Sequence, residues 1–452
     1  MIHRAGQSRA VRWRAGAALA VIAVLALVAA LCGSQSGKGE AAVPASLGWG
    51  VTHTQYSAAD GTSASLVDTA LASLSARSLP QNQHLMGWGA DNPEPSPGRY
   101  DFGALDARIE LIRKTGGTPV ITLCCAPDWM KGGTPGRTDW SRRSLETAPS
   151  PEHYDDFAAL AAKVAERYPD VRHFVVWNEF KGFFDDGRQR WNHEGYTQLY
   201  NKVHRALKKV DERILVGGPY LNMDSFPPGH TRYASALSGP WGTVDQRVLD
   251  AFTYWNEHKV GADFVVVDGS SYARGGVARP DEFGATRKFT AVGRWIGRQT
   301  SLPLWWAEYY TEPGEETGAR RAWTEPHRLA VETAGMMAIA KGGAETAFFW
   351  NAQRRDGRCV SCLWPRAGAA QGAAGDGLPM MALVQRFAAE FPPGTAYRPV
   401  ELAGPDASAV LALGDDGATL VVNTLDRPAR VTVDGRSAGL GGYEVRWLDG
   451  GG

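Results

Sequence analysis

The sequence predicts a closed (β/α)8 TIM barrel followed by a small C-terminal β-sandwich-like domain. Between residues 46 and 391, short apolar strands alternate with amphipathic helices, and we count eight of each. Strands that alternate with helices pair in parallel, and eight such units are typical of a closed barrel. No glycine-rich phosphate fingerprint follows the first strand, which argues against the alternative of an open, doubly wound sheet.

Residues 1–45 have the pattern of an export signal. Four arginines, Arg4, Arg9, Arg12 and Arg14, precede an uncharged segment over 15–37 whose apolar part ends near Leu31. The apolar part, about 16 residues, is short for a membrane span, which needs about 20. We therefore expect a signal peptide and a secreted protein, with an uncleaved anchor and a cell-surface protein as the alternative.

The charge of the remaining chain is close to neutral. Removing residues 1–45 takes five basic residues and one acidic residue from the 48 of each kind, which leaves 43 basic and 47 acidic residues and a net charge of −4. A nucleic-acid-binding surface needs a clustered excess of basic residues. We expect no nucleic-acid partner.

The predicted strands are short apolar runs, several of them continuous enough to be buried on both faces as in a parallel sheet. They cover residues 47–52, 83–88, 119–123, 171–179, 214–218, 264–268, 302–309 and 345–350.

The predicted helices carry apolar residues at spacings of three and four, which place them on one face. In the first, Leu66, Ala70 and Leu74 show this spacing. The eight helices cover residues 65–76, 105–113, 152–167, 196–210, 246–259, 282–298, 326–341 and 379–389.

From residue 395 the pattern changes to strands separated by Gly/Asp turns. Four strands are expected over 409–413, 419–423, 429–433 and 443–447. A domain of about 60 residues buries little surface by itself, so residues 395–452 are expected to pack on the barrel.

Two strands deliver a glutamate at their carboxyl ends. The apolar run 174–177 is followed by Asn178 and Glu179, and the run 302–307 is followed by Glu308. Barrel enzymes keep their chemistry at this end of the strands. Two facing carboxylates are what glycoside hydrolysis needs: one protonates the leaving oxygen and the other acts at the anomeric carbon. The alternative is that each acid caps a helix or pairs with an arginine.

These strand ends resemble a known group of enzymes. Trp177-Asn178-Glu179, Trp306-Ala307-Glu308 and the aromatic strand end Phe349-Trp350 are similar to clan A retaining glycoside hydrolases. The stretches 100–106 and 117–121 resemble glycoside hydrolase family 39, the β-xylosidase-like enzymes. The resemblance extends from residue 46 to about residue 450. It implies that Glu179 is the general acid/base and Glu308 the nucleophile.

The resemblance also implies substrate-binding residues. Asn178 matches the amide that bonds the sugar 2-hydroxyl, Tyr272 the tyrosine that hydrogen-bonds the nucleophile, and Trp350 the platform under the sugar ring. Trp129 and His84 are further candidates for the cleft. For each, packing or a capping role within the protein is the alternative.

Two positions depart from the pattern of the group. Many clan A members carry an arginine on the second strand, where this chain reads Gln81-Asn82-Gln83-His84. A histidine often precedes the tyrosine after the sixth strand, where this chain has Ser270-Ser271. Both changes alter the sugar subsite, so the preferred sugar need not be xylose.

The expected function is that of a secreted retaining β-glycosidase without cofactor or metal, acting on xylan-type or other polysaccharide-derived glycans. A catalytically inactive, carbohydrate-binding barrel is the alternative. A metal-dependent barrel enzyme is a third hypothesis, but no His/Asp cluster stands at ligand spacing. The sequence does not separate xylan, arabinan and mannan as substrates.

Cys359 and Cys362 are predicted to form a disulfide in the exported protein. No second Cys/His pair stands near them to complete a zinc site, and oxidising compartments favour disulfides. Thiol titration of the denatured, unreduced protein measures this. Four reactive thiols in the mature chain would reject the bridge.

Overall fold

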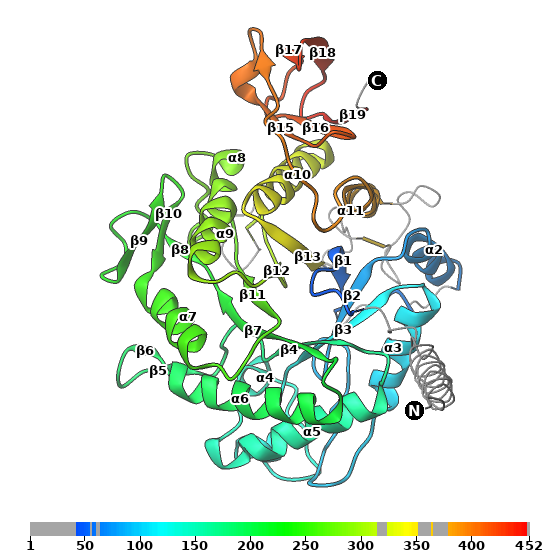
Figure 1. The fold of residues 1–452 in the computed structure, drawn as a ribbon, viewed down its shortest axis with the longest axis vertical. Helices are drawn as coiled ribbons and strands as arrows, with labels where there is room; N and C mark the ends of the chain where they lie inside the picture. Colours follow the sequence, from blue (N-terminus) through cyan, green and yellow to red (C-terminus); the bar gives the residue numbers. More distant parts are fainter. Residues whose placement is uncertain are drawn as a thin grey trace, which may run out of the picture. The chain divides into compact units, whose positions relative to one another are not determined.

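The computed structural model describes residues 42–54, 57–59, 64–313, 323–350, 363–364 and 378–449 (Figure 1). The residues of the expected signal lie almost entirely outside these ranges, as do Cys359 and Cys362. Within the described residues, no helix combines the length and the apolar character that crossing a membrane requires.

The central element is a closed barrel of eight parallel strands, which confirms the predicted fold class. Neighbours around the barrel follow the order β1-β13-β12-β11-β7-β4-β3-β2. The strands are β1 (Gly48–Thr52), β2 (Pro80–His84), β3 (Thr118–Leu123), β4 (His173–Val176), β7 (Leu215–Asn222), β11 (Phe264–Asp268), β12 (Leu304–Trp306) and β13 (Ala344–Trp350).

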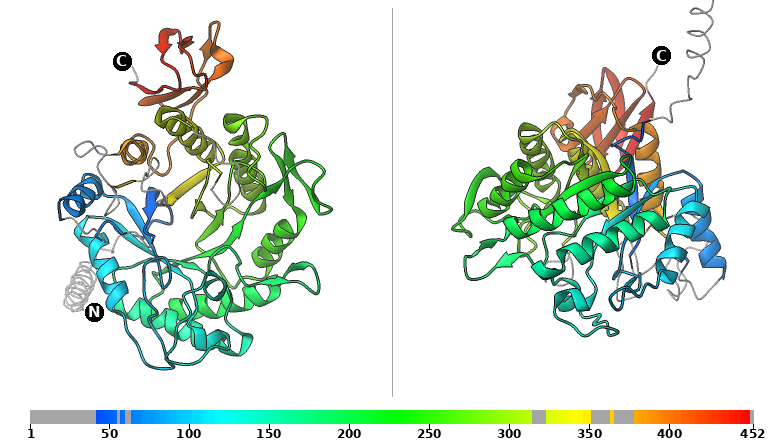
Figure 2. Two further views of the ribbon diagram at one scale, coloured as in Figure 1. Left: turned by 180° about the vertical axis from the view of Figure 1, so that it is seen from behind. Right: turned by 60° about the horizontal axis from the view of Figure 1, so that its bottom comes forward.

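Helices surround the barrel, as the views in Figure 2 show. They are α2 (Ala64–Ser75), α3 (Gly103–Lys114), α5 (Tyr154–Arg167), α6 (His193–Val210), α7 (Gln246–His258), α8 (Glu282–Ala285), α9 (Arg287–Gln299), α10 (Glu325–Lys341) and α11 (Pro379–Glu390). The helix expected over 282–298 is divided at Thr286, which serves as the N-cap of α9.

The second strand differs from its predicted position. It was expected over 83–88, but β2 ends at His84. Gly87 and Trp88 have φ angles of 67° and 43°, and Gly87 makes a bridge to Ala90. The chain therefore turns where the apolar pattern predicted that the strand continues.

The strands carry two apolar layers because their side chains alternate between faces. Inside the barrel, a compact cluster includes Val175, Val266, Trp305 and Phe348. The opposite faces of the strands pack against the helices in a larger core. This double burial explains why the strands appear in the sequence as continuous apolar runs.

Several short elements were not expected. A hairpin of β5 (Phe184–Asp185) and β6 (Arg190–Trp191) follows β4. After β7, a small antiparallel sheet consists of β8 (Ser225–Phe226), β10 (Gly242–Asp245) and β9 (Ala234–Gly239).

The C-terminal strands form two three-stranded sheets, β14-β17-β18 and β15-β16-β19. Their bounds are β14 (Leu402–Ala403), β15 (Val410–Gly414), β16 (Ala418–Asn423), β17 (Ala429–Val433), β18 (Arg436–Leu440) and β19 (Val445–Asp449). A small core that includes Val421 and Val431 draws residues from both sheets, as in a sandwich.

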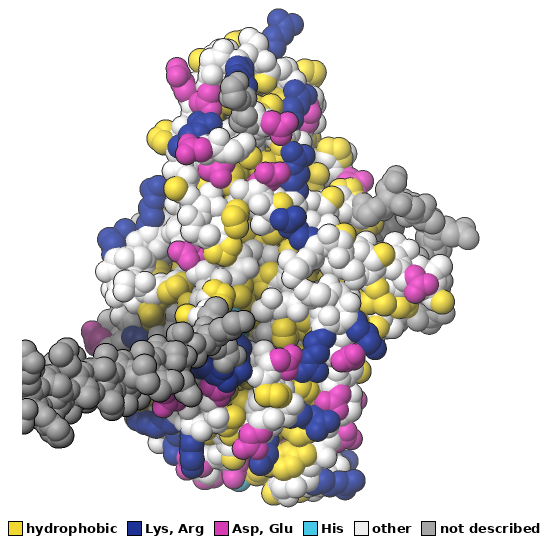
Figure 3. All heavy atoms as spheres, turned by 45° about the vertical axis from the view of Figure 1, so that its right-hand side comes forward, with side chains coloured by type: hydrophobic (Ala, Val, Ile, Leu, Met, Phe, Trp, Pro, Cys, Tyr) yellow, Lys and Arg dark blue, Asp and Glu magenta, His cyan; other side chains and the backbone are white. Residues whose placement is uncertain are grey.

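This domain packs on α10 and α11, as expected. The Lys341 Nζ atom at the end of α10 donates to the Ala412 carbonyl over 2.6 Å. The Trp447 ring lies 5.3 Å from Phe391 and 6.3 Å from Phe387, between ring centroids. On the face shown in Figure 3, basic and acidic side chains are interspersed rather than gathered by sign.

The buried Glu332 carboxyl on α10 should make the stability of the protein depend on pH. Burial raises its pKa from 4.5 to about 8, so the folded state binds this proton more tightly than the unfolded state. The free energy of unfolding should therefore fall as pH rises from about 4.5 to about 8, by an amount on the order of a few kcal/mol. Urea unfolding across this pH range measures the slope.

The Glu332→Gln variant should show a flatter slope, since its amide does not titrate. Glu325→Gln, at an exposed position in the first turn of the same helix, is the matched control and should keep the wild-type slope. Equal slopes in wild type and Glu332→Gln would contradict the assignment.

Candidate active site

The segment that follows β4 is a strained turn that presents Asn178 and Glu179. Trp177, Glu179 and Phe180 have φ angles of 69°, 49° and 55°, in the left-handed region that non-glycine residues rarely occupy. The turn is closed by the Lys181 amide, which donates to the Asn178 carbonyl over 3.0 Å. The Trp177 indole N–H donates to the Lys181 carbonyl over 2.8 Å. Backbone strain of this kind is concentrated at functional sites.

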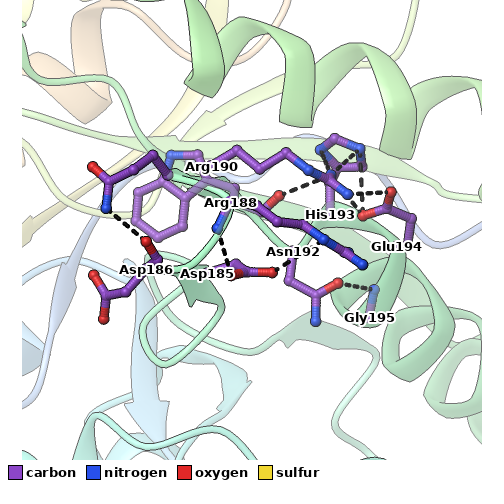
Figure 4. A network of polar contacts seen from close by, with 10 residues as sticks. Asp185, Asp186, Arg188, Arg190, Asn192, His193, Glu194 and Gly195 are labelled. Atoms are coloured by element: carbon purple, nitrogen blue, oxygen red, sulfur yellow. Dashed lines mark hydrogen bonds and ion pairs between the residues drawn. The ribbon is translucent and has the colours of Figure 1, made fainter.

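The β5–β6 hairpin and the start of α6 fix the chain beyond this turn (Figure 4). The Arg190 guanidinium donates to both carboxylate oxygens of Glu194, over 2.8 and 2.7 Å. The Asn192 side chain caps α6 by accepting from the Gly195 amide over 3.0 Å. Within α6, the Tyr196 ring lies 4.0 Å from the Phe180 ring, so the helix supports the strained turn directly.

Glu308 lies two residues beyond the end of β12 and is 3% exposed. The hydroxyls of Tyr220 and Tyr310 donate to it, one to each carboxylate oxygen. Burial and, to a lesser extent, the charge of Glu179 raise the pKa of Glu308 to about 7, against the opposing effects of Lys181 and the two tyrosines. The tyrosines thus stabilise the charged form of a carboxylate that burial disfavours.

Lys181 links the glutamates electrostatically. Its Nζ atom lies 2.7 Å from Glu179 Oε2 and 3.5 Å from Glu146 Oε1. Burial lowers the pKa of the Lys181 ammonium, but the charges of Glu179 and Glu308 outweigh burial and hold that pKa above its ordinary value. Glu179 itself keeps some contact with solvent, with 15% of its side chain exposed.

Asp268, the last residue of β11, brings a third carboxyl group to the same place. It is fully buried, and its carboxyl interacts electrostatically with Glu179 and Glu308. The Asn222 side-chain amide donates to Asp268 Oδ2 over 3.0 Å. Burial, then the charges of Glu179 and Glu308, raise the pKa of Asp268 well above its ordinary value.

Aromatic rings from the ends of two strands, β2 and β13, gather beside Lys181. The His84 ring lies 5.2 Å from Trp88 and 5.7 Å from Trp350, between centroids. Lys181 Nζ lies 5.3 Å from the centre of the Trp88 ring. Burial and the charge of Lys181 lower the pKa of His84 to about 3, so its imidazole is neutral. Neither His84 nitrogen has a hydrogen-bond partner among the described residues.

The structure brings together four of the residues that the sequence singled out. Glu179, Glu308, His84 and Trp350 are joined through Lys181 and the aromatic rings. Asn178, beside Glu179, is buried, and its Oδ1 atom has no partner among the described groups. That oxygen is available to accept a hydrogen bond from a hydroxyl group.

Two other candidates have different surroundings. The Trp129 indole N–H donates to the Glu94 carbonyl over 2.9 Å, and its ring packs on His153. Tyr272 was expected to hydrogen-bond the nucleophile; the hydrogen bonds to Glu308 that the structure shows come from Tyr220 and Tyr310. Cys124 and Cys125, at the end of β3, form a disulfide between adjacent residues.

Lys181, Tyr220, Tyr310 and Asp268 were not singled out in the sequence. Asp268 carried a usable signal, because it ends a buried apolar strand just as Glu308 does. Tyr220 carried a weaker signal, because it lies in the part of β7 beyond the strand predicted at 214–218.

A model described as glycosyl hydrolases family 39 matches residues 91–340, more than half of the chain. The chain belongs to glycosyl hydrolases family 39. A segment of 139 residues of this family 39 chain is 32% identical to a beta-xylosidase from Caldicellulosiruptor saccharolyticus, and it covers 28% of the chain and 27% of that relative. The match therefore spans about a quarter of the relative's length.

The fold of the family 39 chain is also similar to a solved structure. The crystal structure of a monomeric beta-xylosidase from Caulobacter crescentus CB15 matches with a TM-score of 0.51 and 16% identity. The match covers 84% of this chain and 74% of that one, so the likeness in fold extends beyond the segment that the family model covers.

Removing one tyrosine donor should raise the pKa of Glu308. A hydrogen bond to a charged group contributes about 1.5–3 kcal/mol, which corresponds to a rise of about one to two pH units. We expect this in Tyr310→Phe, measured by 13C NMR titration of protein labelled at its glutamate carboxyl carbons.

Tyr309→Phe is the matched control, since the Tyr309 hydroxyl is buried next in sequence but has no partner among the described groups. A titration of Glu308 that is the same in both variants would show that the Tyr310 contact does not stabilise the carboxylate.

Proposed function

We propose that the protein is a retaining β-glycosidase in which Glu308 is the nucleophile and Glu179 the general acid/base. The observation that carries the proposal is that the two carboxyl groups differ in their hydrogen-bond donors and in their exposure to solvent. Glu308 accepts hydrogen bonds from two tyrosines, which favour the anion needed for attack. Glu179 stands at the strained turn, partly open to solvent, where a leaving group and later a water molecule can reach it.

The proposed reaction has two steps. In the first, Glu308 attacks the anomeric carbon while a proton from Glu179 reaches the glycosidic oxygen, so the leaving alcohol departs neutral. In the second, Glu179 takes a proton from water, and the resulting hydroxide displaces Glu308 from the sugar. Two inversions at the anomeric carbon retain its configuration.

The proposed substrates are β-linked glycans of the xylan type. Family membership and the name of the relative, a beta-xylosidase, support this class. The Trp350 and Trp88 rings offer apolar faces for a sugar ring, and His84 and Asn178 offer unpaired buried atoms for its hydroxyls. The second-strand sequence without arginine remains a reason to test other sugars as well.

We further propose that the protein acts outside the cell or at its surface. The basic and apolar pattern of residues 1–45 supports export, and a polysaccharide too large to enter a cell requires an exported enzyme.

The two glutamate variants should fail in different ways. Glu308→Gln loses the attacking group, so its turnover should fall by about 1,000-fold or more with any leaving group. Glu179→Ala loses the proton donor, which costs about 100- to 10,000-fold with a poor leaving group and little with 2,4-dinitrophenolate. This variant should stall at the glycosyl-enzyme and be rescued by azide. A screen of aryl β-glycosides, beginning with the β-xyloside, supplies the substrates.

The azide product identifies the stereochemistry. A β-glycosyl azide from Glu179→Ala is expected, and a crystal structure should place the two carboxyl groups about 5 to 5.5 Å apart. An α-azide, or a separation near 9 Å, would indicate an inverting enzyme. Glu257→Gln, at an exposed position on α7, is the control and should leave every rate unchanged. Wild type without activity on any glycoside would support the inactive, carbohydrate-binding alternative.

A further inference from the structure

The long segment between β3 and α5 lies at the same end of the barrel as Glu179 and Glu308, because it leaves the carboxyl end of β3. We call residues 124–150 of this segment the β3 loop. The β3 loop contains two short helices, η1 (Asp128–Lys131) and α4 (Arg142–Leu145). Loops at this end of a barrel supply the binding residues of barrel enzymes, so its polar groups are candidates for contact with substrate.

The β3 loop touches the turn that carries Glu179. Glu146 Oε1 lies 3.5 Å from the Lys181 Nζ atom, which itself lies 2.7 Å from Glu179 Oε2. A side chain at Gly182 would place its Cβ atom 2.2 Å from the Ala148 amide nitrogen, so a glycine is needed for the two backbones to approach this closely. The β3 loop therefore borders the site directly.

A pocket of about 660 Å³ opens within the β3 loop. Volumes of roughly 300–1,000 Å³ are usual for pockets that bind small molecules. The lining begins at Asp128, includes Lys131, Arg137 and Arg143, and extends to Thr147. Thr147 is next in sequence to the glutamate that contacts the lysine of the site, so one end of the pocket lies close to the reacting groups.

The two acidic residues of the pocket have partners within the β3 loop. Asp128 is buried, and its oxygens accept from the Ser144 hydroxyl over 2.6 Å and from the Asp139 amide over 3.0 Å. The Asp139 carboxylate accepts from the Ser141 amide over 2.8 Å. Both carboxylates are therefore used to fold the loop around the pocket.

The basic residues of the pocket keep donors that no partner uses. The Lys131 ammonium is half-buried and donates to the Ser144 carbonyl over 2.5 Å, which leaves further ammonium hydrogens available. The Arg137 and Arg143 guanidinium groups are exposed and form no hydrogen bond or ion pair with any residue that the structure describes. Guanidinium groups bind carboxylates through paired N–H donors, so the pocket is suited to an anion of this kind.

Trp140 adds an aromatic surface at the edge of the pocket. Its neighbours in sequence, Asp139 and Ser141, both line the pocket. Trp140 is 47% exposed, more than any other tryptophan in the described part of the chain. An indole that is open to solvent offers an apolar face on which a sugar ring can pack. Free carboxylate-binding donors beside an exposed indole are what an acidic sugar requires.

We propose that the β3 loop binds an acidic sugar unit of the polysaccharide substrate. The basic side chains of the pocket bind its carboxylate, and the Trp140 indole packs against its ring. The inference rests on the proposed function, because the bound unit belongs to the same polysaccharide that the two glutamates cleave.

The acidic unit is not the one whose anomeric carbon is attacked. The contacts that lead from the pocket to Glu179 pass through Glu146 and Lys181, so a unit in the pocket lies beyond this ion pair. The substrate class is therefore a polysaccharide that carries carboxylates along its chain or on its branches.

The test measures binding to the Glu308→Gln variant, so that it does not depend on turnover. The probes are oligosaccharides of glucuronoxylan, alginate and hyaluronan, which space their carboxylates differently. Each is compared by calorimetry with its carboxyl-reduced form, in which the acids have become alcohols. At least one acidic probe should bind about tenfold more tightly than its reduced form. This preference should weaken as salt is raised from about 0.05 to about 0.5 M, because the arginines are exposed.

Three further substitutions in this variant assign the preference to the pocket. Replacing both arginines, Arg137→Gln with Arg143→Gln, should reduce binding of the acidic probe to that of its reduced form. Trp140→Ala should weaken both forms by the same factor, because stacking does not depend on the carboxylate. Arg298→Gln is the matched control, at an exposed position in the last turn of α9, which leads to the amino end of β12. This control should keep the full preference.

The outcomes distinguish the inference from the proposed function. Equal binding of the acidic and reduced forms of all three probes would overturn the inference, and hydrolysis of an aryl β-glycoside would still support the proposed function. A preference that falls equally in the double arginine variant and in Arg298→Gln would also overturn the inference, since it would reflect overall charge. A preference lost only in the double arginine variant would support the pocket, and absence of glycoside hydrolysis by wild type would then overturn the proposed function alone.

Discussion

The ion pair between Lys181 and Glu179 is the interaction on which the arrangement of the site depends. Three carboxyl groups meet at the mouth of the barrel, and burial disfavours the charged form of two of them, Glu308 and Asp268. The third, Glu179, forms an ion pair with the Lys181 ammonium over 2.7 Å. The tyrosine hydroxyls stabilise the carboxylate of Glu308 without adding charge. Asp268 accepts one hydrogen bond, from the Asn222 amide, and burial raises its pKa well above the ordinary value. The chemistry of the site follows from this unequal distribution of partners.

The barrel makes the distribution rigid. The groups stand at the ends of four strands, β4, β7, β11 and β12, and parallel strands deliver their carboxyl ends to one rim. The strained turn at Trp177–Phe180 would relax in a free peptide, but indole and backbone hydrogen bonds hold it closed and α6 supports it from behind. The side chains of this turn are therefore held in place by contacts away from the site, such as the packing of Phe180 on Tyr196 of α6.

Much of this arrangement could be predicted from the sequence, and each feature that was not predicted has a physical reason. The eight strands and both strand-end glutamates follow from apolar runs that stop at an ionisable residue. The second strand was placed too late because Leu85 and Met86 continue the apolar pattern although the backbone turns just beyond them. Lys181 could not be assigned because only the left-handed turn directs its side chain back toward Glu179. Asp268 ends a buried apolar strand as Glu308 does, but the glycosidase pattern requires only two carboxylates, and Glu179 and Glu308 already satisfied it.

Helix α10 is buried almost along its whole length, including residues that face away from the barrel, because the C-terminal sheets cover its outer side. A helix with no polar face belongs to two hydrophobic cores at once. The C-terminal domain is therefore part of the folding unit of the barrel, although the site lies elsewhere. Ending the chain at residue 395 would expose the apolar outer side of α10 to solvent. The barrel of this chain therefore depends on the C-terminal sheets to keep the outer side of α10 covered.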